Sequence, residues 1–266
     1  MEYKLVDEFQ LDWHLEGKSK QTAKNYAFDL RKFLKEYENP TLNQAKEWVL
    51  ETDSIVGRRK RAQAIRAFGR WLADQGIAGF EWHKQLPLTK EKTFPQQTVV
   101  QSDYERALVN AKSFRDKAII EVLWSCGLRR TELAVLEVTD IDFLGGYIVV
   151  RQSKTGKPRI VPLSPNAKRA LRRYLQGRSE GSLFKVQSNT VRLILKRLNA
   201  PSAHAWRRGW AVQALRNGVS ETSVRAAAGW SSGAMVARYT RALSGELAVE
   251  EFQRSWSEVM LHRSGR

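Results

Sequence analysis

The chain has 266 residues and a formal charge of +17, from 45 basic and 28 acidic side chains. Nine Trp, ten Phe and seven Tyr supply enough bulky apolar material for one or two folded cores, which excludes a globally disordered chain. The positive excess favours a polyanionic partner such as nucleic acid, because each neutralised phosphate releases counterions, but charge alone does not name an activity.

The cysteine count and the absence of a signal-peptide pattern or a long apolar run indicate where the protein is located. Cys126 is the only cysteine, which excludes an intramolecular disulfide and favours a reducing compartment. The first 18 residues carry several charges and lack the apolar centre of a signal peptide. No run of about 18 apolar residues is present to cross a bilayer. We therefore expect a cytoplasmic protein, and its positive charge would associate it with nucleic acid.

The first third of the chain predicts four helices. Leu5, Phe9 and Trp13 recur every four residues, as on the apolar face of a helix. Ser19 is a candidate N-cap for the second helix, and a third, short helix follows. The fourth covers about residues 57–75 and ends before Gly76.

The fourth predicted helix carries an unusual run of cations. Ile65, Phe68 and Trp71 form an apolar face that can pack against a core. The other side can face a phosphate backbone or lie in a major groove. A solvated helix face is the alternative, because most charge runs have no ligand. The candidate DNA-binding residues are Arg58, Arg59, Lys60, Arg61, Arg66 and Arg70.

Residues 83–98 show no helical period and contain two prolines, which is typical of a linker between domains. Ser102 and Glu105 then have the spacing of a capping box, which predicts a helix beginning at Asp103. The linker therefore divides a helical first domain from a second domain.

The second domain mixes helices with a hairpin. Helices are predicted at about 114–125, 165–176 and 190–198, and the rest of the chain has a helical pattern to its end. Two runs rich in Val and Ile, Tyr147–Gln152 and Arg159–Leu163, predict strands joined by the turn SKTGK. The expected fold class is mainly α with a small antiparallel β-sheet.

Two segments of the second domain contain candidate phosphate ligands. Arg129 stands at a predicted helix start with Glu132 three residues on, and its guanidinium fork matches two phosphate oxygens. Lys154 lies in the hairpin turn, where its ammonium can reach into a site. Taken singly, the first is more often a surface ion pair and the second a polar turn.

Two later segments add a base and a nucleophile. His204 and Arg207 are three residues apart and share one helix face. Trp230 and Tyr239 lie nine residues apart, with an arginine before the tyrosine. A phenol with a pKa of about 10 is a poor nucleophile, but cations that polarise a phosphodiester make it usable. Singly, each of these residues is more often ordinary surface or packing.

In their order and spacing these residues resemble the tyrosine recombinase (phage integrase) family. The motifs are GLRRTE, SKTGKPRIVPL, HAWR, AGW and ARYT. The intervals of 23 residues from Arg207 to Trp230 and of nine from Trp230 to Tyr239 are those of family members. The matched positions are Arg129, Glu132, Lys154, His204, Arg207, Trp230 and Tyr239.

The resemblance implies a division into named domains. Residues 1–82 would form the helical, SAM-like core-binding domain that contacts DNA, and 83–98 the linker. Residues 99–245 would form the catalytic domain. Residues 246–266 would form a C-terminal helix that docks on a neighbouring protomer, with packing in cis as the alternative.

The resemblance also implies a mechanism. Tyr239 would attack the scissile phosphorus, forming a 3′-phosphotyrosyl bond and releasing a 5′-hydroxyl. Lys154 would protonate the leaving oxygen, His204 would serve as base, and Glu132 would orient its neighbours. Charge on the non-bridging oxygens would be stabilised by Arg129, Arg207 and either His204 or Trp230.

The implied partners are double-stranded DNA with inverted-repeat core sites and further copies of the chain, as a tetramer that passes through a Holliday junction. Accessory DNA-bending proteins are further candidate partners. Because covalent catalysis conserves the phosphodiester energy, no cofactor is expected, neither ATP nor a metal ion.

Two departures from the family pattern stand out. Trp230 occupies a position where most bacterial and phage members have histidine, although the Cre and yeast Flp-type enzymes carry tryptophan. An indole can donate a hydrogen bond but cannot shuttle a proton. The residues RRGW after Trp206 replace a different family segment, which we expect to affect packing more than chemistry.

Several functions stay open within this resemblance. A catalytically silent DNA-binding protein of the same fold is one, although every catalytic position is filled. A type IB topoisomerase-like relaxing enzyme shares the chemistry. Among recombinases, the chain fits an integrase of a mobile element, with an Xer- or Cre-like resolvase of chromosome or plasmid multimers as the alternative.

Overall fold

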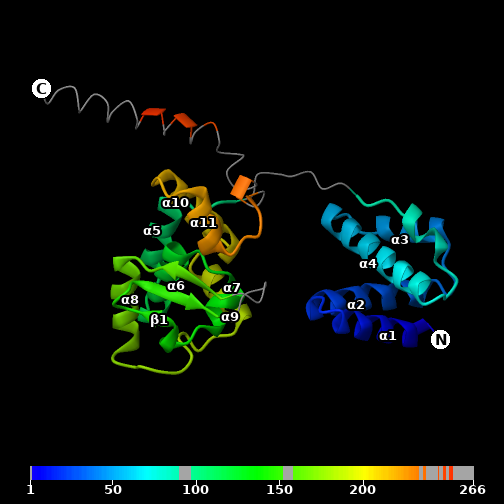
Figure 1. The fold of residues 1–266 in the computed structure, drawn as a ribbon, viewed down its shortest axis with the longest axis horizontal. Coiled ribbons are helices and arrows are strands. Elements are labelled where there is room, and N and C mark those ends of the chain that lie inside the picture. The colour runs from blue at the N-terminus through cyan, green and yellow to red at the C-terminus, as the bar shows by residue number, and fades with distance from the viewer. Residues whose placement is uncertain are drawn as a thin grey trace, which may run out of the picture. The chain divides into compact units, whose positions relative to one another are not determined.

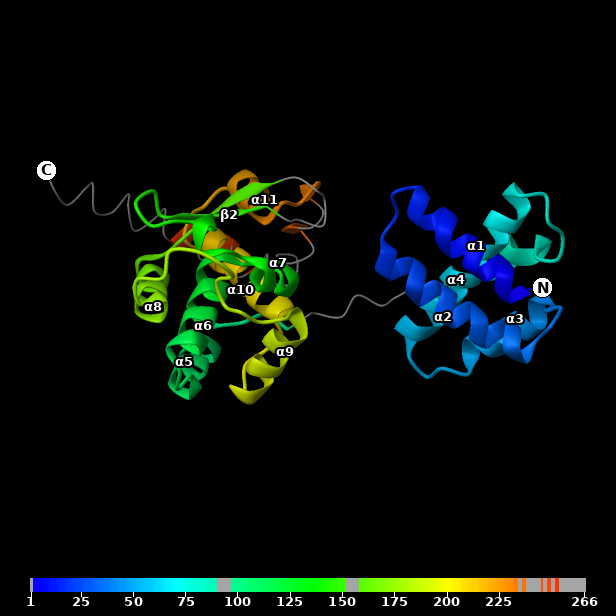
Figure 2. The same cartoon turned by 90° about the horizontal axis from the view of Figure 1, so that it is seen from below.

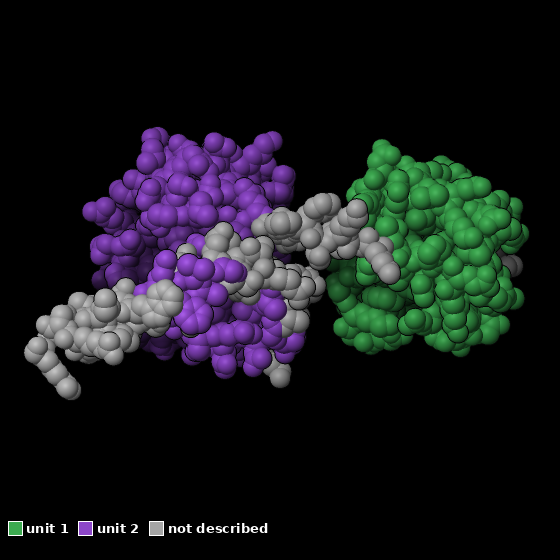
Figure 3. Space-filling view, turned by 90° about the horizontal axis from the view of Figure 1, so that it is seen from above, with its two compact units in different colours: residues 1–94 green, residues 95–266 purple. Residues whose placement is uncertain are grey.

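The computed structural model describes residues 2–89, 97–151, 158–233, 236–237, 245, 248–249 and 252–253. The chain divides into two compact units, Met1–Phe94 and Pro95–Arg266, coloured separately in Figure 3. The predicted fold class, mainly α with a small antiparallel sheet, is confirmed. None of the helices in the described parts of the chain is long and apolar enough to cross a membrane.

In its described residues, 2–89, the first unit contains helices and no strands, and aromatic rings form its core. Phe9 meets Phe68 edge-on with ring centroids 5.5 Å apart, and Phe33 lies 5.0 Å from Trp48. Ser19 caps the second helix, as predicted, by accepting a hydrogen bond from the backbone of Thr22. Its elements are the helices α1 (Glu2–Leu15), α2 (Lys20–Glu36), α3 (Leu42–Leu50) and α4 (Ile55–Asp74), labelled in Figure 1, and the 3₁₀ helix η1 (Glu81–Gln85).

The chain beyond α4 returns to this core before it leaves the unit. His83 and Leu86, both within the segment predicted as linker, are almost completely buried against α4. A Cβ atom at Gly69 would stand 2.4 Å from the Cβ of His83, so η1 approaches α4 only because residue 69 has no side chain. Residues 90–96 lie outside the described part of the chain.

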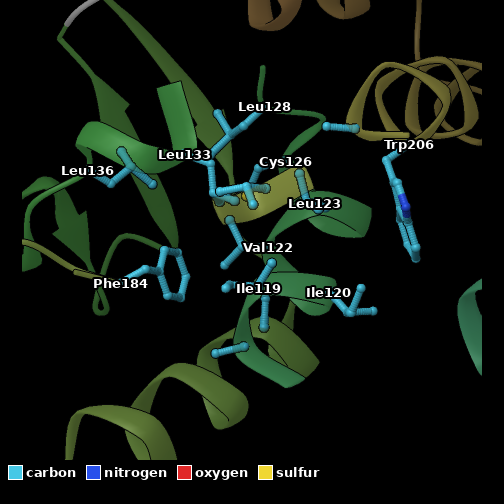
Figure 4. Packing of buried hydrophobic residues seen from close by; sticks show 14 of the residues in the cluster. Ile119, Ile120, Val122, Leu123, Cys126, Leu128, Leu133, Leu136, Phe184 and Trp206 are labelled. Carbon is cyan, nitrogen blue, oxygen red and sulfur yellow. The ribbon is translucent and has the colours of Figure 1, made fainter. Parts of the chain in front are cut away.

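The second unit is built around α6, whose side chains are buried on nearly every side. Figure 4 shows Ile119, Val122 and Leu123 of α6 at the centre of this core. Because α6 buries most of its side chains, other helices must cover it, and α5, α8 and α10 pack against it (Figure 2). The helices are α5 (Gln101–Asn110), α6 (Phe114–Cys126), α7 (Arg130–Val135), α8 (Pro165–Leu175), α9 (Ser188–Arg197), α10 (Ala203–Arg216) and α11 (Glu221–Ala228), with a 3₁₀ turn η2 (Val138–Asp140).

The antiparallel sheet has the order β1-β2-β3, with β1 at Ile141–Asp142, β2 at Tyr147–Val150 and β3 at Arg159–Pro162. Ile148 faces Val161 across the two longer strands, and both are fully buried. The sequence predicted β2 and β3 but missed β1, because two residues are too few to show alternation.

The first helix of the second unit begins earlier than the capping-box pattern predicts. Helix α5 starts at Gln101 and not at Asp103. The side chain of Asp103 accepts a hydrogen bond of 3.2 Å from the backbone of Val100, which fixes that residue as the N-cap. Glu105 instead bonds the side chain of Gln101, 2.8 Å away.

Residues 97–99, at the start of the described part of the second unit, are hydrogen-bonded to α10. Arg208 donates a hydrogen bond of 2.8 Å from Nε to the carbonyl of Gln97, and Val99 donates its backbone N–H to the carbonyl of Ala205 at 3.2 Å. A Cβ atom at Gly209 would lie 2.4 Å from the carbonyl oxygen of Val99. Arg208 and Gly209 of the RRGW segment therefore hold residues 97–99 against α10, which is a packing role.

Because the two cores share no residue, we predict that the two units unfold independently. Phe68→Ala should destabilise the first unit by about 3–5 kcal/mol, since it opens a cavity in the aromatic core. Phe184→Ala, at an equally buried position, is the matched change in the second unit. Urea unfolding followed by circular dichroism should show two transitions, each moved by one substitution only. A single transition moved by both would contradict the prediction.

Candidate active site

The structure brings five of the seven predicted site residues together. Arg129, Glu132, Arg207 and Trp230 lie in contact or in a chain of contacts, and His204 joins them at the edge. The other two, Lys154 and Tyr239, lie outside the described residues. The site is therefore built here from its arginine cluster.

Arg129 is placed by the end of one helix and the start of the next. Gly127 ends α6 in the left-handed conformation, with φ of 56°, and Leu128 is buried. Arg129 then becomes the N-cap of α7, and its backbone N–H donates a hydrogen bond of 2.8 Å to Glu132. Trp210 packs so closely on Gly127 that a Cβ atom there would lie 2.5 Å from the ring. Glycine is thus required both by φ and by space.

Glu132 is the centre of the cluster. Its side chain is only 2% exposed, yet it accepts four hydrogen bonds. Two come from Arg129, through the backbone N–H and through Nη1 at 2.5 Å. Two come from Arg159, whose Nη1 and Nη2 lie 3.0 and 2.8 Å from the two carboxylate oxygens. Nη1 of Arg207 lies 4.0 Å away.

The pKa of Glu132 reflects this environment. Burial by itself would raise the pKa, but the hydrogen bonds from Arg159 and Arg129 outweigh it and lower the pKa to about 2. The carboxylate is therefore charged throughout the physiological range. It balances one of the three guanidinium groups that surround it.

The guanidinium of Arg207 is oriented by hydrogen bonds to two backbone carbonyls. Its Nη1 donates to Gly127 at 2.8 Å, and its Nη2 donates to Ala228. Both acceptors lie beside helix ends, of α6 and of α11, where carbonyl groups have no partner within the helix. The Arg207 side chain is only 3% exposed, so its orientation is set by the fold.

Trp230 forms the wall beside Arg207. It follows Gly229, which ends α11 in the left-handed conformation. The guanidinium carbon of Arg207 lies 5.2 Å from the ring centroid, within the range of a cation–π contact. Trp230 is buried in a small cluster with Trp210 and Val236. Its position supports packing against the arginine.

His204 stands in the first turn of α10 and is exposed. Its pKa is lowered from the ordinary value, first by loss of hydration and then by the positive charges of Arg208, Arg207 and Arg129. The imidazole is therefore neutral at neutral pH and able to accept a proton.

A basic pocket opens beside Arg129 and His204. It has a volume of about 550 Å³ and lies between α7, α9 and the start of α10. Its cationic lining matches an anionic ligand, and Leu195 and Ala203 supply apolar surface. The remaining polar lining is Arg130, Thr131, Arg192, Lys196 and Ser202.

In the first unit, most of the predicted DNA-binding cations of α4 are engaged within the chain. Arg58 donates to the carbonyl of Thr52 at 2.8 Å, and Arg61 contacts Glu51 and lies over the ring of Trp48.

The same holds for the opposite edge of α4. Arg59 donates to the carbonyl of Thr89 at 3.1 Å, and Arg66 to that of Leu86 at 3.3 Å. Lys60 and Arg70 are exposed. The run thus serves partly to fix the neighbouring loops.

Arg159 was missed from the sequence. Arg159 is two and four residues before the buried Val161 and Leu163, and residues two apart in a strand point to the same face. Its side chain is therefore on the buried face of β3. A charged residue on the buried face of a strand needs a partner, so the sequence could have predicted a buried ion pair at this position. The partner, Glu132, lies 27 residues away and could not be named from spacing.

Comparison with known proteins gives consistent results. The family model described as "Phage integrase family" matches residues 97–246. The tyrosine recombinase XerA of Pyrococcus horikoshii is 26% identical over 270 residues, covering 93% of each chain. Two lambda integrase structures, a dimer bound to a COC′ core site and a tetramer bound to a Holliday junction, each match with a TM-score of 0.72. They are 17% and 16% identical and are aligned over 89% of this chain and 76% of theirs.

The depressed pKa of Glu132 generates a prediction about acid stability. A carboxylate with a lowered pKa in the folded state stabilises the fold above its unfolded pKa, and this contribution is lost as pH falls toward about 2. The difference in unfolding free energy between the wild type and Glu132→Gln should therefore shrink by about 2 kcal/mol from about pH 6 to about pH 3.

Denaturant titrations of the second unit at each pH measure this difference. The matched change at an exposed acid of α11, Glu221→Gln, is the control. Parallel pH curves for wild type and Glu132→Gln would show that the carboxylate is not stabilised by its arginines.

Proposed function

The chain belongs to the phage integrase family of tyrosine recombinases, and we propose that it cuts and rejoins DNA through a 3′-phosphotyrosyl bond to Tyr239. The family model covers more than half of the chain. The observation that carries the proposal is the buried cluster in which Glu132 holds Arg129 and lies beside Arg207, at the edge of a basic pocket.

The cluster suits a phosphodiester in its transition state. Three guanidinium groups around one carboxylate leave two net positive charges in a largely buried site. Charge grows on the non-bridging oxygens as the nucleophile attacks, and fixed cations stabilise it without reorganising. We assign this role to Arg129 and Arg207, with Trp230 packing against the latter.

The proton transfers are assigned to His204 and Lys154. The lowered pKa of His204 supports a role as base toward the phenol of Tyr239, because a neutral imidazole can accept a proton. Lys154 is the proposed general acid, since it follows β2 in the sequence and precedes the strand that carries Arg159.

We propose double-stranded DNA with inverted-repeat core sites as the substrate and a tetramer on DNA as the active assembly. Lambda integrase is bound to a core site and to a Holliday junction in the matching structures. The charge of +17 supports a DNA partner. Residues 1–82 would be the core-binding domain, with Lys60 and Arg70 of α4 exposed for phosphate contact.

The C-terminal segment 246–266 is proposed to dock on a neighbouring protomer. Val249 and Phe252 are three residues apart in the sequence, as on one face of a helix, and such an apolar face suits contact with another protomer. Accessory DNA-bending proteins and a cytoplasmic location remain predictions.

A second candidate is resolution of chromosome or plasmid multimers by an Xer-like enzyme. The alignment with XerA covers 93% of both chains, so the two share one compact layout. Cleavage of repeats that flank the gene favours integration, whereas conversion of plasmid dimers to monomers favours resolution.

The nucleophile is tested by Tyr239→Phe, which removes only the phenol oxygen. This variant should bind core-site DNA with the affinity of the wild type and form no covalent adduct with a nicked suicide substrate. Gel separation of protein–DNA adducts under denaturing conditions measures the result. The matched variant Tyr174→Phe, on α8, should react normally. An adduct with Tyr239→Phe would overturn the assignment.

The general acid is tested by Lys154→Ala. Cleavage of ordinary DNA should slow by about 100-fold or more, the range for loss of a general acid. A 5′-bridging phosphorothiolate should restore the rate, because sulfur leaves without a proton. Lys185→Ala, at an exposed position between α8 and α9, should leave both rates unchanged. Persistent slowness on the phosphorothiolate would exclude Lys154 from this role.

A further inference from the structure

Arg159 holds a central place in the cluster, although the recombinase resemblance assigns no role to it. All three of its guanidinium nitrogens are engaged within the protein. Two donate to the two oxygens of Glu132, at 3.0 and 2.8 Å, in the parallel geometry that an arginine fork allows. The side chain is 7% exposed, so it is not itself available to a large ligand.

The third nitrogen extends the connection to another segment. Nε of Arg159 donates a hydrogen bond of 2.8 Å to the carbonyl of Ala227, near the end of α11. The next carbonyl along the chain, that of Ala228, accepts from Arg207. A Cβ atom at Gly229 would lie 3.0 Å from Cδ of Arg159. Arg159 therefore ties β3 to α7 and to the turn that precedes Trp230.

The contacts of Arg159 also affect the charge balance around Glu132. A buried carboxylate needs compensation, and Arg129, Arg159 and Arg207 are the cations around Glu132 in the described structure. If Arg159 were absent, Arg129 and Arg207 alone would have to compensate the charge of Glu132. Nη1 of Arg207 already lies 4.0 Å from the carboxylate. Both would then be drawn toward Glu132 and away from a bound phosphate.

We propose that Arg159 is a positioning residue for DNA cleavage, which satisfies Glu132 so that the charges of Arg129 and Arg207 remain available to the scissile phosphate. This inference rests on the proposed function. Arginine is required because its fork spans both carboxylate oxygens while Nε reaches Ala227. A lysine has a single ammonium and cannot meet the three acceptors in this geometry.

A double-mutant cycle tests the proposal through charge. The variants are Arg159→Met, Glu132→Gln and the two combined, in the full-length protein. Arg159→Met should slow adduct formation on a saturating nicked suicide substrate by about 100-fold, similar to the loss of one donor to a transition-state charge. Its affinity for DNA in the Tyr239→Phe background should change by less than about threefold, because Arg159 is buried.

The combined variant gives the decisive result. A neutral glutamine no longer competes for Arg129 and Arg207, so the combined variant should react at least about tenfold faster than Arg159→Met alone. A residue with only a structural role would show no such recovery. A combined variant that is as slow as Arg159→Met, or slower, would overturn the proposal.

Controls keep the outcomes separate. Arg178→Met removes another arginine that fixes backbone carbonyls, those of Ser182 and Leu183, and should leave the rate unchanged. If Arg159→Met does not unfold cooperatively and is therefore not folded, the neutral variant Arg159→Gln and its combination with Glu132→Gln are judged by the same criterion. A wild type that forms no adduct would refute the proposed function, whereas a wild-type rate in Arg159→Met would refute this inference alone.

Discussion

The site depends on one buried carboxylate. Burying Glu132 costs several kcal/mol unless its charge is paired and hydrogen-bonded. The structure meets this cost with arginines from two segments, Arg129 beside α7 and Arg159 on β3, and brings Arg207 of α10 within 4.0 Å. The same carboxylate thus collects cations from three parts of the chain at one point. Repulsion among three guanidinium groups would otherwise oppose that arrangement.

Helix ends supply the rest of the geometry. Gly127 and Gly229 both end helices in the left-handed conformation, which leaves carbonyl groups without partners inside the helix. Arg207 uses the carbonyl of Gly127 and that of Ala228, the residue before the second glycine. Backbone atoms in this way give a flexible cation a fixed direction. This rigidity suits the role proposed for Arg207, because preorganised charge stabilises a transition state without reorganisation.

Helix α10 joins this site to the rest of the second unit. Its residue 207 faces the carboxylate, while the next residue, Arg208, holds the carbonyl of Gln97. Gly209 admits the backbone of Val99, and Trp210 covers Gly127. Four successive residues therefore link the entering chain, the end of α6 and the cluster. This stretch therefore combines packing contacts with the placement of Arg207.

Local physics determined much of this protein from the sequence alone. Periodicity and N-caps gave most helices, and alternation gave β2 and β3, because each of these signals lies within a few residues. Arg129, Glu132, His204 and Arg207 were instead singled out by the order of motifs in the family resemblance. Tertiary structure alone decided which groups compensate one another. Arg159 meets Glu132 across 27 residues, and Arg207 meets Gly127 across 80. Such hydrogen bonds form only when distant segments pack, so no local spacing encodes them.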